Sequence, residues 1–186
     1  MKSIRGIMLN AWLQFLKERY GEDKVVKAIA SLPADERPQM EKSILDASWY
    51  PIEITRVLGK IQAAVGGKDE IAEDLGKYLA EYAFRGSYKV FLTNDPLSQA
   101  KKIANALDYF YRDVHKFEVE TTGPHSCIMR YITERAPSVA TCVSRRSWWI
   151  QTLQMSGAKK LKLTHSRCMS NGHNSCEYDV EWELAS

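Results

Sequence analysis

The chain has 186 residues, a formal net charge of +3 and 45% hydrophobic residues. This length fits one domain with a substantial core, and the composition is ordinary for a globular protein. The small net charge gives no argument for nucleic-acid binding, no apolar run is long enough to cross a bilayer, and the first residues lack the apolar segment of a signal peptide. We therefore expect a single cytoplasmic domain without a membrane span and without a nucleic-acid partner.

The N-terminal part, residues 1–112, is predicted to be helical. Apolar residues recur there at helical spacing in segments that end at glycine or proline. These segments are 5–20, 22–32, 34–45, 51–65, 69–84 and 97–111, with a short helix or turn over 88–92. Pro51 is expected in the first turn of its helix, where a missing N–H costs nothing.

The C-terminal part, residues 115–186, is predicted to form the sheet. Alternation of apolar and polar residues marks strands over 116–122, 126–134, 159–168 and 175–184. A helical pattern over 138–156 separates the second strand from the third. The fold class is therefore α+β: N-terminal helices followed by a four-stranded antiparallel sheet with one long crossing helix.

Four potential metal ligands converge on the last two strands. His165 and Cys176 fall on the inward faces of a hairpin, Cys168 lies in its turn, and Cys142 lies near the start of the crossing helix. A Cys3His set is a standard closed site for structural Zn²⁺. The order C-x22-H-x2-C-x7-C is unusual for a zinc finger, so buried free cysteines with a core histidine, or a Cys168–Cys176 disulfide, stay open as alternatives.

The same stretch resembles a known family. The pattern C-M-x-x-G-H-x-x-C-x-Y-x-V-x-W, from Cys168 to Trp182, is similar to the C-terminal signature of the 4-vinyl reductase type of small-molecule-binding domain, as in phenol-sensing domains of sigma-54-dependent activators. In those sensors three cysteines and one acidic residue hold zinc. The resemblance implies that Cys142, Cys168 and Cys176 take the cysteine positions, while His165 stands in the place of the acidic ligand.

A second resemblance is to haem nitric-oxide-binding domains. The chain has their length and their order of helices before sheet, and Tyr131-x-Thr133-x-Arg135 is a near match to their tyrosine–serine–arginine motif for haem propionates. This resemblance implies haem as an alternative cofactor. The proximal histidine would then have to be His115.

Aromatic residues are the other informative feature, with five Trp, nine Tyr and five Phe. Such a set can line an apolar pocket with a few hydrogen-bond donors, although plain core packing explains it as well. We predict a pocket between helices and sheet, lined by Trp149, Arg145, Phe110, Tyr88, Phe91 and Trp148. Because adjacent helical residues point about 100° apart, Trp148 and Trp149 are not expected to face the same pocket centre, and Trp149 is the one that we expect to face it.

The expected function is that of a small-molecule-binding sensor or carrier, with a role in signalling. No GxSxG, P-loop, GxGxxG or HExxH motif is present, and a closed zinc site leaves no position for a reacting water, so no enzymatic activity is expected. The family resemblances leave two other functions open: an assembly subunit of TRAPP-like architecture, and an enzyme related to tetrapyrrole vinyl reductases. The apolar run Ile7-Met8-Leu9 beside the stripe of the first helix predicts a homodimer.

Overall fold

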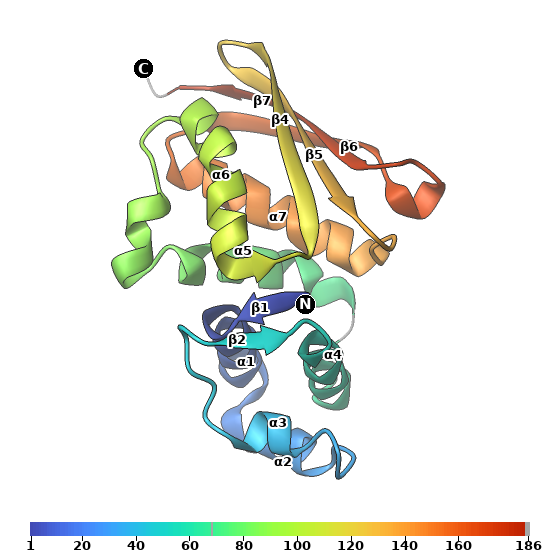
Figure 1. The fold of residues 1–186 in the computed structure, drawn as a ribbon. Coiled ribbons are helices and arrows are strands. Elements are labelled where there is room, and N and C mark those ends of the chain that lie inside the picture. The colour runs from blue at the N-terminus through green and yellow to red at the C-terminus, as the bar shows by residue number, and fades with distance from the viewer. Residues whose placement is uncertain (68, 185–186) are drawn as a thin grey trace.

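The computed structural model describes residues 1–67 and 69–184. Its fold is α+β, with helices first and the larger sheet after them, as predicted (Figure 1). None of the described helices is both long and apolar enough to cross a membrane. The leading helices are α1 (Gly6–Tyr20), α2 (Glu22–Ala30), α3 (Pro38–Glu41), α4 (Ile54–Ala64), α5 (Ala72–Ala83) and α6 (Pro96–Phe110), with 3-10 turns η1 (Asp69–Ile71) and η2 (Gly86–Phe91).

The larger sheet is antiparallel throughout and has the strand order β4-β5-β7-β6. Its strands are β4 (His115–Gly123), β5 (Ser126–Thr133), β6 (Lys159–Arg167) and β7 (Cys176–Glu183), and α7 (Val139–Met155) connects β5 to β6. The prediction of four strands and one crossing helix is confirmed. Alternation set the register correctly, because one face of β7 is buried at every second residue from Cys176 to Trp182 while the other carries acidic side chains.

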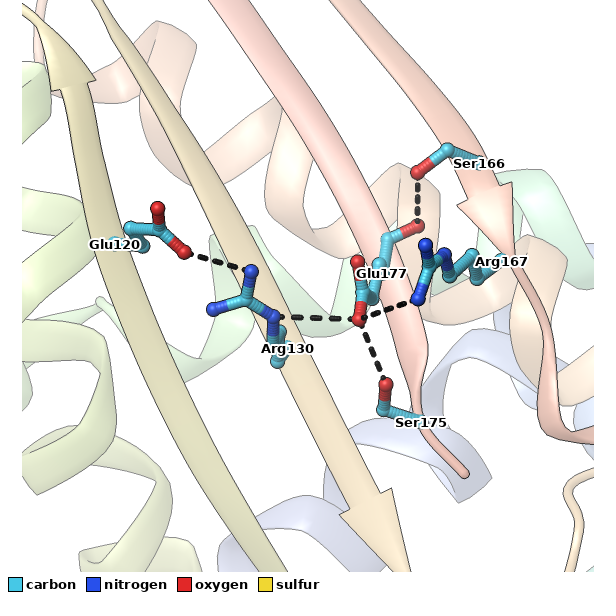
Figure 2. Close-up of polar contacts among 6 residues, drawn as sticks. All are labelled: Glu120, Arg130, Ser166, Arg167, Ser175 and Glu177. Carbon is cyan, nitrogen blue, oxygen red and sulfur yellow. Dashed lines mark hydrogen bonds and ion pairs between the residues drawn. The ribbon is translucent and has the colours of Figure 1, made fainter. Parts of the chain in front are cut away.

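The outer face of this sheet is held by an ion-pair network around Glu177 (Figure 2). Arg130 lies 2.7 Å from the Glu120 carboxylate and 3.3 Å from that of Glu177, so it links β4, β5 and β7. Ser175 donates a hydrogen bond to the same Glu177 oxygen at 3.0 Å, and Arg167 of β6 approaches it at 4.0 Å. Charges of opposite sign on neighbouring strands thus fix the register near the end of the hairpin.

A second, three-stranded sheet was not predicted. Its order is β2-β1-β3, formed by β1 (Ser3–Arg5), β2 (Trp49–Pro51) and β3 (Tyr111–Arg112). Two helix predictions are wrong for the same region: Pro51 lies in β2 rather than in the first turn of α4, and 34–45 contains only the short α3. Strands of two or three residues show no periodicity, and their partners come from distant parts of the chain.

The core has two hydrophobic clusters that meet at α5 and α6. One gathers residues of α1, α2, α4 and α5, and the other joins α6 and α7 to the inner face of the sheet. Helices α5 and α7 pack closely because residue 76 is a glycine: a Cβ there would lie 2.1 Å from the Ser144 carbonyl oxygen. The division of the single domain into a helical part and a sheet part stays a prediction. Helix α6 belongs to the helical part in sequence, but its Ile103 and Leu107 pack in the sheet-side cluster.

The apolar surplus of α1 is buried within the chain. Ile7 is 3% exposed, Met8 4% and Leu9 0%. The argument that this surface needs a second copy is therefore wrong, because α4, α5 and β1 already cover the helix. The homodimer itself stays a prediction.

Candidate functional site

A cavity of about 550 Å³ lies between the leading helices and α7, which backs the sheet. Its walls come from α1, α4, α5, α6, β5 and α7, and they are predominantly apolar. This volume is in the range of small-molecule and cofactor sites, and such a wall with a few polar groups is their usual make-up. The cavity is therefore a candidate ligand-binding site.

Four of the six predicted pocket residues line this cavity. They are Phe110, Arg145, Trp148 and Trp149. Tyr88 and Phe91 do not line it, and that part of the prediction is wrong. Their rings pack instead against the Tyr109 and Phe110 rings, because η2 packs against α6.

Both tryptophans of α7 line the cavity, contrary to the expectation that only Trp149 would. The two indoles stand edge to face with their ring centres 4.9 Å apart, and Trp149 stacks on Phe117 of β4 at 5.0 Å. The expectation assumed one point-like centre, whereas the cavity extends along α7 and meets two sides of the helix. Each indole N–H is buried without a hydrogen-bond partner among the described residues.

The polar end of the cavity is formed by Arg145 and Tyr131. The Arg145 guanidinium lies over the Tyr131 ring at 3.6 Å, a cation–π contact. Behind Tyr131 stacks the His115 imidazole at 4.8 Å, and Tyr111 meets that imidazole edge-on at 5.8 Å. Arg135, the third residue of the sequence motif, is exposed and does not line the cavity, so the basic group at this end comes from α7.

His115 is held in its neutral form. Burial, and then the positive charge of Arg145, lower its pKa to about 4. Both ring nitrogens are buried without a hydrogen-bond partner in the described part of the chain. The residue is thus an imidazole with a free lone pair, separated from the cavity by the rings of Tyr111 and Tyr131, which line it.

Several lining residues were not predicted as site residues. Met8 was assigned to a homodimer surface, and Trp12, Leu75 and Tyr111 lie in segments that were predicted only as helices. The helical spacing of the apolar residues was the signal available in the sequence, but it does not say what they face. In the structure Trp12 donates its N–H to Gln62 of α4 at 2.9 Å and so lies between two helices rather than on the sheet. Which stripe residues face a gap depends on how the helices meet.

The four predicted metal ligands are brought together by α7, β6, β7 and the turn between the strands. Their ligand atoms, from Cys142, His165, Cys168 and Cys176, all lie within 4.8 Å of one another. The Cys142 and Cys168 sulfurs are 3.8 Å apart, and no disulfide joins any described cysteine. Two thiolates each 2.3 Å from a tetrahedral zinc would be about 3.8 Å apart. The spacing and chemistry of this set suit a tetrahedral Zn²⁺.

The thiols of this cluster influence one another. Burial, then the neighbouring Cys176 and Cys168, raise the pKa of Cys142 to about 12. For Cys168, burial acts in the raising direction, but hydrogen bonds from Ser170, Cys142 and Cys176 outweigh it and lower the pKa. Such a cluster of thiols with one imidazole could hold a metal ion, because a cation would remove the repulsion among neighbouring thiolates.

The structure was compared with known proteins. An H-NOX protein from Shewanella oneidensis in the Fe(II)NO ligation state aligns with a TM-score of 0.73 and 16% identity, covering 97% of this chain and 99% of that one. An unliganded Fe(II) H-NOX protein from K. algicida aligns with a TM-score of 0.70, 16% identity and 98% coverage of both chains. The chain has the H-NOX fold. A structure from work on haem redox potential and porphyrin distortion aligns with a TM-score of 0.69 and 11% identity over 96% of this chain and 99% of that one.

Sequence comparisons add no family. No family model matches the chain, and no curated protein sequence gives a significant match. Of the two resemblances drawn from the sequence, the one to haem nitric-oxide-binding domains agrees with the structural neighbours in fold. The resemblance to 4-vinyl reductase domains finds no support among these neighbours, which are H-NOX structures aligned over nearly the whole chain.

Proposed function

We propose that this chain is a small-molecule sensor domain of H-NOX architecture, that its cavity holds an apolar ligand, and that haem is the first occupant to test. The observation that carries the proposal is the cavity of about 550 Å³, which lies between α7 and the leading helices of a fold shared with haem-binding proteins. A binding role without catalysis agrees with the lining, in which apolar side chains surround a few donors.

Haem needs apolar walls, a polar end for its carboxylates and a residue for its iron, and the lining suits the first two. The walls are apolar and aromatic, and Tyr131, Thr133 and Arg145 at the polar end suit carboxylates. The third is a residue that would hold the iron. Helix α6 contains no histidine, and the imidazole that stacks on the cavity-lining Tyr131 is that of His115.

His115 would therefore hold the iron, which in bound haem would supply the gas-binding centre. Its neutral ring and its partnerless nitrogens are the properties that an iron ligand would need. Tyr111 and Tyr131 stand between the imidazole and the cavity, so this role requires one of the two rings to turn aside.

We also propose that the Cys3His cluster binds one structural Zn²⁺. Cys142 belongs to α7, and the other three ligands belong to the β6–β7 hairpin. A metal there would tie the cavity-lining helix to the sheet, since Cys142 lies one turn before Arg145 on α7. Four protein ligands leave no open position, so the proposed role of the metal is to stabilise the fold.

Titration of the purified, reduced protein with ferrous haem tests the main proposal. We expect one equivalent to bind, with a sharp absorption band of the bound haem. The variant His115→Ala should change this spectrum or lose the haem, while His125→Ala, whose ring lies against Trp182 away from the cavity, should leave it unchanged. Equal spectra for all three proteins would show that His115 is not the iron ligand, and absence of binding would show that haem does not occupy the cavity.

A further inference from the structure

The Arg145 side chain is incompletely satisfied in the described structure. Its terminal Nη1 is buried without a hydrogen-bond partner, and among the described residues it forms no ion pair. A guanidinium has five N–H donors, and a buried charged donor without a partner is costly. The neighbouring Tyr131 and Tyr178 hydroxyls interact with this group, and it has donors left for a further acceptor.

The neighbours of Arg145 satisfy only part of its charge. Tyr131 offers its ring face, and the Cys142 and Cys176 thiols with Tyr178 lie close enough to influence it. A zinc-bound set of three thiolates would place one net negative charge on that side. That charge would balance the cation, while the Arg145 side chain also lines the cavity.

Polar side chains line the cavity in two places. Hydroxyl groups of Thr133, Thr141 and Ser144 share the lining with Arg145, while Thr55, Gln62 and the exposed Arg56 of α4 and Asp69 of η1 line another part, and Leu75, Leu107 and the two indoles are apolar. A guanidinium fork matches a carboxylate in two parallel hydrogen bonds, a stronger and more specific pairing than any neutral acceptor gives.

We propose that the cavity binds an apolar carboxylic acid, with the carboxylate on Arg145 and the hydrocarbon or ring system along Trp148 and Trp149. This inference rests on the proposed function of the cavity and names its ligand class. Arg145 is the residue that decides specificity, by accepting acids and disfavouring neutral compounds of the same shape. Fatty or aromatic acids and a porphyrin share this chemistry, and the experiment separates these sources.

The test compares acids with their neutral counterparts on the full chain after delipidation. One pair is dodecanoic acid and dodecanol, and the other is protoporphyrin IX and its dimethyl ester. Binding is measured by quenching of tryptophan fluorescence and by calorimetry. We expect at least one acid to bind about tenfold or more tightly than its neutral partner, because a charge-assisted bidentate pair adds at least that factor.

Two variants locate the effect. Arg145→Met should abolish the preference for the acid, and Arg145→Lys should keep part of it. Arg146→Met is the matched control, since its guanidinium bonds the Leu163 carbonyl at 3.3 Å and does not line the cavity. If Arg145→Met does not fold, the role of Arg145 is tested by comparing acid with neutral partner in the wild type and in Arg145→Lys.

The outcomes separate the two proposals. A preference in the dodecanoic pair supports a fatty-acid ligand, and a preference in the porphyrin pair alone supports a tetrapyrrole. Equal affinity for acid and neutral partner overturns the carboxylate inference while the sensor proposal stands. Absence of binding by all four compounds overturns the sensor proposal and the inference together.

Discussion

His115 should make the stability of the ligand-free protein depend on pH. In the unfolded chain its pKa is near 6.5, and in the folded protein burial and Arg145 lower it to about 4. Between these values the unfolded chain binds more protons than the folded one, so the free energy of unfolding falls as the pH falls from 6.5 toward 4. The stabilisation is complete above pH 6.5 and is lost at and below pH 4.

The size of the effect follows from the shift. A difference of about 2.5 pKa units corresponds to about 3 kcal/mol, of which about 2 kcal/mol are already lost at pH 5. The groups on the cavity side of the imidazole are Tyr111, Tyr131 and Arg145, and the two tyrosines stay neutral in this range because burial raises the pKa of each; Lys2, Asp113, Lys116 and Glu134 lie around a surface hollow on the other side. His115 is thus a group at this end of the cavity whose protonation changes stability between pH 4 and 6.5.

Urea unfolding followed by tryptophan fluorescence measures the effect at pH 8, 7, 6 and 5. His115→Phe keeps an aromatic ring against Tyr131 and removes the titration. The wild type should lose about 2 kcal/mol more than this variant between pH 8 and pH 5, and His125→Phe should behave as the wild type. Parallel curves for wild type and His115→Phe would show that the imidazole is not buried in its neutral form, and its proposed role as an iron ligand would lose its basis.

The other predictions concern the metal, the helix contact, the indole and association. Cys168→Ser should lose the metal found by elemental analysis and unfold more easily, whereas Cys127→Ser, a buried cysteine outside the cluster, should retain one Zn²⁺ per chain. Gly76→Ala should destabilise by about 1–3 kcal/mol in thermal or urea unfolding, despite the better helix propensity of alanine, because its methyl group would collide with the Ser144 carbonyl. Trp149→Phe should leave folding nearly intact and weaken ligand capture, and equal affinity would assign Trp149 to the core alone. Light scattering at micromolar concentration should give the mass of a dimer, and a monomer mass across that range would remove the homodimer.

The larger sheet and the ligand cluster could be predicted because short sequence spacings determine them. Alternation along β7 places Cys176 on the buried face, and the two-residue interval from His165 to Cys168 keeps both in one hairpin end. Only Cys142 had to be brought in from another element, and the helix that crosses the sheet could do so. Local periodicity is thus sufficient where a site is built mainly from one hairpin.

The cavity could be predicted only in part, since it is a gap left by packing rather than a pattern in the sequence. Phe110 and Tyr88 are both aromatic residues near α6, yet only Phe110 faces the cavity, because the η2 segment that carries Tyr88 packs against that helix. The small sheet around β1 was missed for a related reason. Its register joins Ile4 to Tyr50 and Tyr111, and no local rule links residues so far apart.

Native mass spectrometry of the full chain, purified under reducing conditions and then mixed with ferrous haem and dodecanoic acid in turn, tests the central claim most directly. The claim is that the cavity beside Trp149 and Arg145 is a ligand site. The account predicts a folded protein that gains the mass of one ligand molecule per chain, with Arg145→Met losing the dodecanoic acid adduct. A wild-type spectrum without any bound ligand, before and after both additions, would contradict it.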